Sequence, residues 1–301
     1  MRTVYVGTSE FAAAVLERLA ASPHRPALVV TRPDRPRGRG RRLASPPVAK
    51  TATELGLPLD QPASINDEAA RDRIDAAAPE TICVCAFGAL IEEPLLSAYR
   101  MLNVHPSLLP RWRGAAPVER AIIAGDDRTG VSIMVLTAGL DSGPVCLQQA
   151  EPIKPDDTYG TLAARLQALG GDLLVRALDQ HPECAEQDDA LATYADKVSP
   201  QDRALDPRLS AAELERVVRA LTPHIGAYVA LDDGSPLGVL AARAVPAHAD
   251  GPPVGVVSFH GAVPVLGCAD GALELLIVQP PGRRAMPGED FLRGRRGAGT
   301  R

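Results

Sequence analysis

Short apolar runs separated by amphipathic segments dominate the N-terminal part of the chain. Each run is four to six residues long. Continuous apolar runs of this length are typical of central parallel strands that are covered on both faces. The predicted strands are Thr3–Val6, Ala27–Val30, Thr81–Ala86, Met101–His105, Ser132–Leu136 and Val145–Gln149.

Between these strands, apolar residues recur at helical spacing, which predicts helices that cover the sheet. Ser9 stands just before the first helical segment and is expected to cap it. Strands that alternate with helices indicate an α/β fold, here a Rossmann-like, doubly wound parallel sheet. The predicted helices are Phe11–Ala21, Pro47–Leu55, Asp67–Ala77 and Thr158–Leu178.

The pattern changes after Gln180, where a polar stretch without sustained periodicity is interpreted as a linker. One helix, Ser210–Leu221, is followed by short strands that are separated by Gly, Pro and Asp turns. Such spacing is typical of a small β-barrel, here of the OB-like kind. The predicted domains are therefore residues 1–187, a linker at 188–205 and a C-terminal barrel at 206–301.

The overall composition indicates an ordinary globular protein, with 46% hydrophobic residues among 301. The N-terminus lacks a basic region followed by a long apolar run, and no stretch approaches the roughly 20 apolar residues of a membrane helix. The five cysteines show no metal-ligand spacing, and Cys83 and Cys85 are expected to be buried, reduced thiols. We therefore expect a cytoplasmic protein with no metal site and no membrane contact.

The formal net charge of −5 averages over an uneven distribution of arginine. Six arginines and one acidic residue lie between Arg32 and Arg42, and a second basic cluster near the C-terminus includes Arg283 and Arg284. Local patches of this kind can bind a polyanion even on an acidic protein. Composition alone favours a solvated loop and tail, because the chain uses arginine far more than lysine throughout.

The turn after the first predicted strand, Gly7-Thr8-Ser9-Glu10-Phe11, contains a single glycine. A pyrophosphate cradle needs several glycines, because the backbone must approach the phosphates closely. The turn therefore argues against a nicotinamide or flavin enzyme, and the sequence contains no P-loop motif.

Polar residues gather at the end of the predicted Met101–His105 strand. Asn103 and His105 are two residues apart on an extended chain, so both side chains project from the same side. They also stand at the carboxyl end of a central strand, where open α/β sheets place their ligands. Asp141 lies in a glycine-flanked turn between the next two strands. Each residue alone is more often structural, but together they predict a polar ligand site whose chemistry stays open.

Two sequence motifs carry a resemblance to a known family. N-x-H-x-S-L-L-P-R-W-R-G-A-A-P begins at Asn103, and G-x-S-I-x(6)-L-D-x-G begins at Gly130. Both resemble the folate-dependent formyltransferases, and the extended SLLPRWRGAAP form resembles the methionyl-tRNA formyltransferases in particular. The resemblance covers nearly the whole chain, including the opening VGTSEFA, the arginine loop, TYADKVS and VQPPGRRAM.

Formyl transfer to an amine passes through a tetrahedral oxyanion and releases a proton from nitrogen. His105, if neutral, would be the general base. Asp141 would orient the imidazole and stabilise its cation, and Asn103 would donate to the developing oxyanion. This chemistry needs no metal.

The resemblance also implies binding roles outside the catalytic trio of Asn103, His105 and Asp141. The folate-side wall would be formed by Ser107, Leu108, Leu109 and Pro110. Arginine offers a bidentate fork for phosphates and purine edges, and Arg39 would be the main residue that reads the acceptor stem of a tRNA. The other expected tRNA contacts are Arg37, Arg41, Arg42 and Lys197, with the C-terminal barrel as a second RNA surface.

The expected function is transfer of the formyl group of 10-formyltetrahydrofolate, a cosubstrate and not a tightly bound cofactor, to methionine on initiator methionyl-tRNA. A formyltransferase for glycinamide ribonucleotide or a nucleotide-linked amino sugar shares this chemistry but needs no six-arginine loop. A glycinamide enzyme would also end after the first domain. An RNA-binding protein built on an inactive enzyme is disfavoured, because all three site residues are retained. The expected partners are the tRNA and the folate, and the chain is expected to be a monomer.

Overall fold

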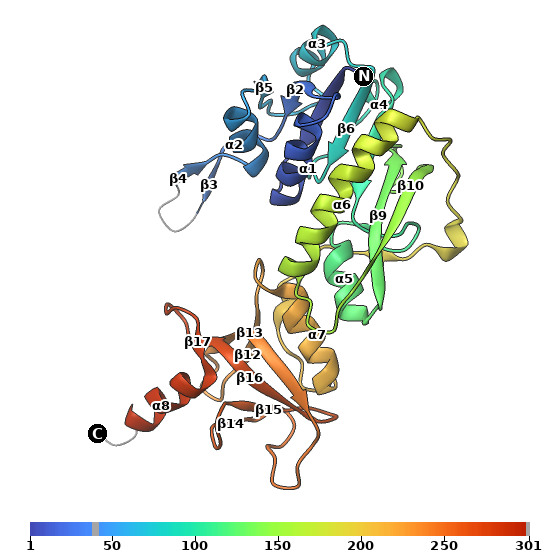
Figure 1. Cartoon of the computed structure of the whole chain (residues 1–301). Helices are drawn as coiled ribbons and strands as arrows, with labels where there is room; N and C mark the ends of the chain where they lie inside the picture. The colour runs from blue at the N-terminus through green and yellow to red at the C-terminus, as the bar shows by residue number, and fades with distance from the viewer. Residues whose placement is uncertain (38–41, 299–301) are drawn as a thin grey trace. The chain divides into compact units, whose positions relative to one another are not determined.

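The computed structural model describes residues 1–37 and 42–298, which form two compact units (Figure 1). The N-terminal unit comprises Met1–Pro117, Arg128–Pro152 and Ala163–Ala195. The C-terminal unit comprises Val118–Asp127, Ile153–Leu162 and the chain from Asp196 onward. The domain boundaries drawn from the sequence remain a prediction.

A seven-stranded sheet forms the centre of the N-terminal unit, in the order β10-β9-β7-β6-β1-β2-β5. The five strands from β7 to β5 are mutually parallel, as predicted. Every residue of β1, β6 and β7 is buried, which explains their continuous apolar sequences. The strands are β1 (Thr3–Gly7), β2 (Pro26–Val30), β5 (Leu59–Asp60), β6 (Thr81–Cys85), β7 (Met101–His105), β9 (Arg128–Val135) and β10 (Val145–Pro152).

One edge of this sheet departs from the parallel pattern. β9 runs antiparallel to both β7 and β10, whereas the sequence analysis continued the parallel arrangement through these strands. The connection between β9 and β10, residues 136–144, is too short for the crossover of a dozen or more residues that a parallel pair needs, so these two strands pair antiparallel. β9 therefore ends beside Leu102, near the amino end of β7, and the turn that follows folds back toward Asn103 and His105.

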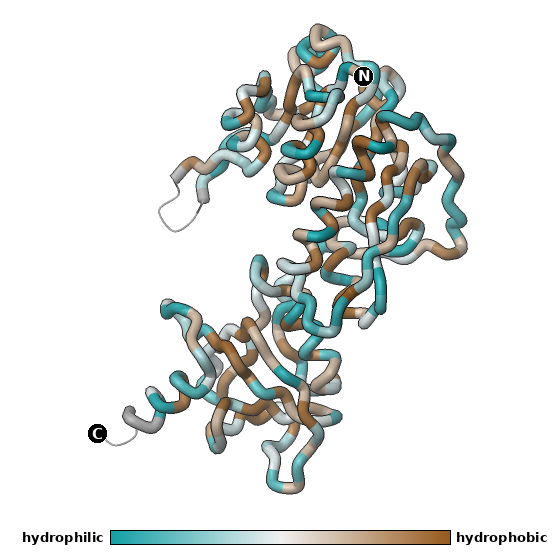
Figure 2. Tube along the Cα trace, viewed as in Figure 1, coloured by the Kyte–Doolittle hydropathy of each residue, from teal (hydrophilic) through white to brown (hydrophobic). Residues whose placement is uncertain are grey.

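Helices cover the sheet close to their predicted positions. Ser9 caps α1, since its hydroxyl accepts a hydrogen bond from the amide of Ala12. Figure 2 shows hydrophobic residues along the strands, with hydrophobic and hydrophilic residues mixed on the helices around them. Two short helices, α4 and α5, were not foreseen. The helices are α1 (Glu10–Ala20), α2 (Pro47–Glu54), α3 (Glu68–Ala76), α4 (Leu95–Ala98), α5 (Pro117–Ala124) and α6 (Tyr159–Gln180). In the part of the chain that the structure describes, no helix is long and apolar enough to cross a membrane.

The C-terminal unit contains a helix, α7 (Ala211–Leu221), and short antiparallel strands, as the turn-rich sequence predicts. Ser210 and Glu213 form a reciprocal capping box at the start of α7. The strands are ordered β12-β13-β16-β15-β14, with β17 paired to β16, and their shared core is built mainly from aliphatic residues. The elements are β12 (Ala227–Ala230), β13 (Pro236–Val245), β14 (Val257–Ser258), β15 (Val265–Gly267), β16 (Ala272–Gln279), β17 (Met286–Pro287) and α8 (Gly288–Ala298).

Part of the segment interpreted as a linker is ordered structure. Residues 189–191 and 201–203 form single 3₁₀ turns. β11 (Tyr194–Ala195) pairs in parallel with β8 (Arg113–Gly114). This pairing ties the segment to the loop that follows β7.

The cysteines fall into two classes. Cys83 and Cys85 are free and fully buried, as expected, and burial raises the pKa of each thiol to about 12. Cys268 is also a buried thiol. Cys146 and Cys184 form a disulfide that the sequence analysis did not foresee, because 38 positions separate them in the chain. The disulfide connects β10 to the segment after α6.

Removing this disulfide is expected to destabilise the N-terminal unit. A cross-link over a loop of this length stabilises a fold by about 2–4 kcal/mol, so Cys146→Ser should lower the free energy of unfolding by that amount in a urea titration. Wild type treated with a reductant is the matched control and should reproduce the variant's curve. Alkylation after unfolding should modify three of the five cysteines without reduction and all five after it. Five modified cysteines without reduction would contradict the disulfide.

Candidate active site

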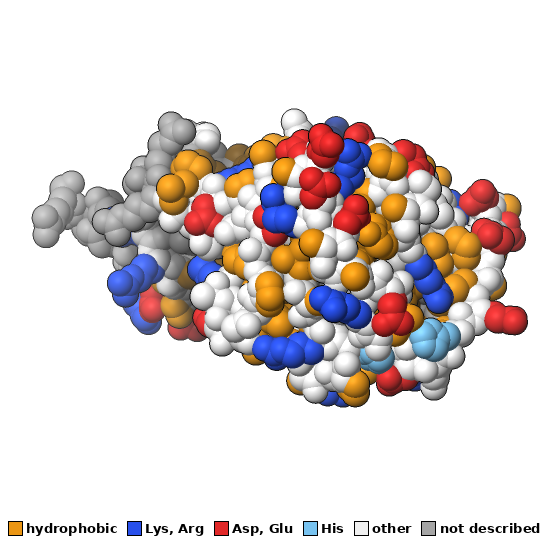
Figure 3. All heavy atoms as spheres, turned by 90° about the horizontal axis from the view of Figure 1, so that it is seen from above, with side chains coloured by type: hydrophobic (Ala, Val, Ile, Leu, Met, Phe, Trp, Pro, Cys, Tyr) orange, Lys and Arg blue, Asp and Glu red, His pale blue; other side chains and the backbone are white. Residues whose placement is uncertain are grey.

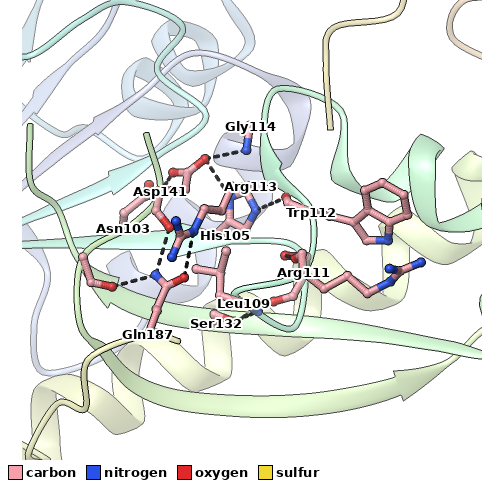
Figure 4. Close-up of polar contacts among 12 residues, drawn as sticks. Asn103, His105, Leu109, Arg111, Trp112, Arg113, Gly114, Ser132, Asp141 and Gln187 are labelled. Atoms are coloured by element: carbon pink, nitrogen blue, oxygen red, sulfur yellow. Dashed lines mark hydrogen bonds and ion pairs between the residues drawn. The ribbon is translucent and has the colours of Figure 1, made fainter. Parts of the chain in front are cut away.

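The carboxyl end of β7 and the turn after β9 bring three polar side chains together (Figure 4). Asn103 and His105 are both buried, and both contact Asp141. The Asn103 amide nitrogen lies 3.4 Å from Asp141 Oδ1, and His105 Nδ1 lies 3.5 Å from Asp141 Oδ2. The structure therefore brings together the three residues that the sequence analysis selected.

The backbone around Asp141 explains how its carboxylate reaches this position. Asp141 adopts a left-handed conformation, with φ of 44°, which few residues other than glycine tolerate. Its Oδ2 accepts a hydrogen bond of 2.9 Å from the backbone amide of Gly114. A Cβ at Gly143 would lie 2.0 Å from the carbonyl oxygen of Val135, so only glycine fits in that turn. The carboxylate is thus held by the loop after β7 as well as by its own turn.

The hydrogen bonds of His105 assign its proton. Its Nε2 lies 2.9 Å from the carbonyl oxygen of Trp112, and a carbonyl can only accept, so Nε2 carries the hydrogen. In the neutral ring, Nδ1 is therefore the unprotonated nitrogen, and it faces Asp141. A proton taken up at Nδ1 would form an ion pair with that carboxylate.

This arrangement suits a reaction in which a proton leaves one atom while negative charge develops on another. His105 Nδ1 can accept the proton, and Asp141 can stabilise the imidazolium that results. The Asn103 amide has two hydrogens, of which Asp141 takes one. The other can be donated to a developing oxyanion.

The four residues expected at the folate-side wall lie in the turn directly after β7. Ser107 is fully buried, and its hydroxyl donates 2.6 Å to the carbonyl of Arg111. The Leu109 amide donates to the hydroxyl of Ser132, which in turn donates to the Ser107 carbonyl. Ser107 and Leu109 therefore shape the turn, while Leu108 and Pro110 retain partly exposed surface.

Three further residues support the site, and the sequence analysis did not select them. Arg113 is buried, with a side chain that is only 4% exposed. Its guanidinium donates 3.0 Å to Gln187 Oε1 and 2.7 Å to Asp189 Oδ1. Gln187 and Asp189 come from the segment that looked like a linker. The sequence offered one signal for this network, namely the charged Arg113 inside the RWRG motif. A buried charge needs a partner, so a buried Arg113 implies hydrogen-bond acceptors close to it.

The residues expected to contact tRNA are only partly within the described chain. Arg39 and Arg41 lie at residues 38–41, outside the described residues. Arg37 is the last residue of β3 (Arg35–Arg37) and Arg42 the first of β4 (Arg42–Ala44), and these strands pair antiparallel. The side chains of both arginines fall outside the described part. Lys197 is exposed at the start of the last segment of the C-terminal unit. On the face in Figure 3, basic and acidic side chains are interspersed, which agrees with a modest net charge.

Known proteins match both halves of the chain. A family model described as formyl transferase matches residues 1–178, and the formyl transferase C-terminal domain matches residues 197–296. The methionyl-tRNA formyltransferase of Methylococcus capsulatus is 41% identical and covers 100% of this chain and 99% of its own length. That of Thiobacillus denitrificans is 42% identical, with the same coverage of both chains.

A solved structure adds a likeness of fold. HypX from Aquifex aeolicus in complex with tetrahydrofolic acid superposes with a TM-score of 0.66 at 16% identity. The superposition covers 97% of this chain and 47% of HypX, so this chain corresponds to about half of that protein. With both family models matched in chain order and relatives at about 41% identity over the full length, the chain belongs to the formyl transferase family.

Proposed function

We propose that this protein transfers the formyl group of 10-formyltetrahydrofolate to the amino group of methionine on initiator methionyl-tRNA. The product is N-formylmethionyl-tRNA for translation initiation. The observation that supports the proposal most strongly is the match to methionyl-tRNA formyltransferases over the whole chain, C-terminal unit included. Because bacterial translation takes place in the cytoplasm, the activity implies a cytoplasmic enzyme, and we expect it to act as a monomer.

The acceptor suits the polar trio at the end of β7. An α-amino group titrates near pH 8, so little driving force is needed to free its lone pair at neutral pH. His105 Nδ1 takes the proton that leaves the attacking nitrogen, and the neighbouring carboxylate of Asp141 stabilises the cation. Asn103 donates to the oxyanion of the tetrahedral intermediate. As the intermediate collapses, the bond from the formyl carbon to the folate nitrogen breaks, and that nitrogen takes the proton from the His105 imidazolium and leaves as tetrahydrofolate.

The folate is a cosubstrate that enters and leaves with each turnover. Leu108 and Pro110 offer partly exposed apolar surface in the turn after β7, and such surface suits the flat pterin ring. Ser107 and Leu109 hold that turn through Ser132. The buried pair therefore positions the wall, and the two half-buried residues contact the folate.

Arginines supply the second substrate's binding energy. Arg39 reads the acceptor stem, supported by Arg37, Arg41 and Arg42, while exposed Lys197 contacts phosphate. The assay that tests the function mixes the purified protein with 10-formyltetrahydrofolate and either charged initiator tRNA or small amines. Formylation of small amines alone would overturn the proposal in favour of a small-amine formyltransferase.

Replacing any member of the trio is expected to lower turnover by at least about a hundredfold, the usual scale for an acid–base or oxyanion group. The variants are Asn103→Ala, His105→Ala and Asp141→Ala, each measured by single-turnover formylation of charged initiator tRNA. Thermal unfolding serves as the control for folding. Near-normal rates in His105→Ala would remove it from the chemistry.

Arg39→Ala is expected to lower kcat/KM for initiator tRNA and to leave formyl-folate affinity nearly unchanged. If Arg39 reads a base edge, about 1–3 kcal/mol of discrimination is lost. Arg39→Lys should rescue poorly, because an ammonium keeps the charge but not the fork. Full activity in Arg39→Lys would instead indicate a simple phosphate contact, and unchanged kcat/KM in Arg39→Ala would mean that the loop does not read RNA.

Exposed cations of the C-terminal unit are expected to contact phosphates without selectivity. Neutralising Lys197, Arg203, Arg283 and Arg284 should weaken all tRNAs about equally. The slope of log Kd against log salt should fall by roughly one for each phosphate that is no longer neutralised. Arg176→Gln, exposed on α6, is the matched control and should leave the slope unchanged. An unchanged slope in the quadruple variant would make these charges ordinary solvated surface.

A further inference from the structure

The side chain of Gln187 bridges the two loops that meet at Asp141 (Figure 4). Its amide nitrogen donates 2.9 Å to the carbonyl of Asp141 and 2.7 Å to the carbonyl of Gly143. Its amide oxygen accepts 3.0 Å from Arg113 Nε. Two carbonyl acceptors require the NH₂ end and a guanidinium requires the oxygen, so the orientation of the amide is determined.

The turn that carries Asp141 needs such support. Its left-handed backbone is strained for a residue with a Cβ, and strained residues persist where their surroundings hold them. Pairing of β10 with β9 begins only at Val145. Gln187 bonds the carbonyls of Asp141 and Gly143, both of which precede that strand.

The same side chain also steadies the opposite loop. Gly114, whose amide binds the Asp141 carboxylate, directly follows Arg113. Arg113 is a buried cation, and Gln187 and Asp189 both accept from its guanidinium. Gln187 therefore acts on Asp141 from two directions: through the turn's carbonyls and through the loop that holds the carboxylate.

The backbone that carries Gln187 is itself anchored on both sides. Three residues earlier, Cys184 is joined to Cys146. Ala185 exchanges two backbone hydrogen bonds, of 2.8 and 2.9 Å, with Val145. Further along, β11 pairs with β8. A side chain on a backbone anchored in this way can impose a position on a strained turn.

We propose that Gln187 is a positioning residue, which holds the Asp141 carboxylate in place against His105 and Asn103 for formyl transfer. The inference rests on the proposed function, since it assigns catalytic work to that trio. A displacement of about 1 Å in a catalytic group can cost up to a hundredfold in rate. The loss expected on removing the Gln187 donor is therefore about 10- to 100-fold in kcat, with little change in KM for either substrate.

Two substitutions separate positioning from general structural support. Gln187→Glu keeps the length of the side chain and an acceptor for Arg113, but places carboxylate oxygens against two carbonyls. Gln187→Ala removes all three hydrogen bonds. If the bonds to the turn position Asp141, both variants lose kcat to a similar extent. A Gln187→Glu enzyme with wild-type kcat would overturn the proposal, because only the Arg113 contact would then matter.

A double-mutant cycle tests whether Gln187 acts through Asp141. In an Asp141→Asn background, Gln187→Ala should lower kcat by less than about threefold further, because the group that it positions is already removed. A full additional 10- to 100-fold loss there would overturn the proposal, since an independent structural role gives additive effects. Gln149→Ala is the matched control: Gln149 is exposed on β10, and its replacement should leave kcat and KM unchanged.

Failure of the proposed function is distinguishable from failure of this inference. Wild-type activity on charged initiator tRNA or on small amines tests the function, and the ratio of variant to wild type is measured with whichever amine is formylated. A crystal structure of Gln187→Ala gives a readout that is independent of activity. Displacement of the Asp141 carboxylate from His105 supports positioning, whereas an unmoved carboxylate overturns it.

Discussion

The central constraint in this structure is that one carboxylate must face an imidazole and an amide that come from a different strand. Asp141 lies 38 positions after Asn103 in the chain, yet their side chains are within 3.4 Å. β9 ends beside the amino end of β7, where Val135 pairs with Leu102, and the turn after β9 folds back until Asp141 reaches Asn103 and His105. Three local features hold the carboxylate in that contact. They are the left-handed backbone at Asp141, the close backbone approach at Gly143 and the hydrogen bond from the Gly114 amide.

The protonation pattern of His105 follows from its two neighbours, because one ring nitrogen faces a carbonyl and the other faces a carboxylate. Nε2 of His105 donates a hydrogen bond to the Trp112 carbonyl, so the unprotonated Nδ1 faces Asp141. The proposed proton acceptor, His105 Nδ1, and the carboxylate proposed to stabilise the resulting cation are therefore adjacent before any substrate enters. Such preorganisation reduces the reorganisation that must accompany proton transfer. The hydrogen bonds of Gln187 and Arg113 contribute to this preorganisation. They restrain the two loops that set the position of Asp141 relative to His105.

The segment at residues 184–195 has a larger role than its polar composition indicates. It carries Gln187 and Asp189, closes a disulfide with β10 and adds β11 beside β8. A polar sequence without periodicity is typical of solvated connections. Here the segment is ordered by contacts with distant loops, so its hydrogen-bond partners lie outside its own sequence.

Local sequence was sufficient to predict the main strands and helices, though not the short helices α4 and α5, and to select the three residues of the trio. Apolar runs identify β1, β6 and β7 because these strands are buried on both faces, and Ser9 predicts the start of α1 because its hydroxyl satisfies a free amide. Asn103 and His105 share a face through the two-residue period of a strand. Tertiary structure alone decided the antiparallel pairing of β9 with β7, the disulfide and the contacts of Gln187 and Arg113. Each of these contacts joins residues that are far apart in the chain. Their pairing depends on the geometry of loops, which produces no periodic pattern of apolar and polar residues in the sequence.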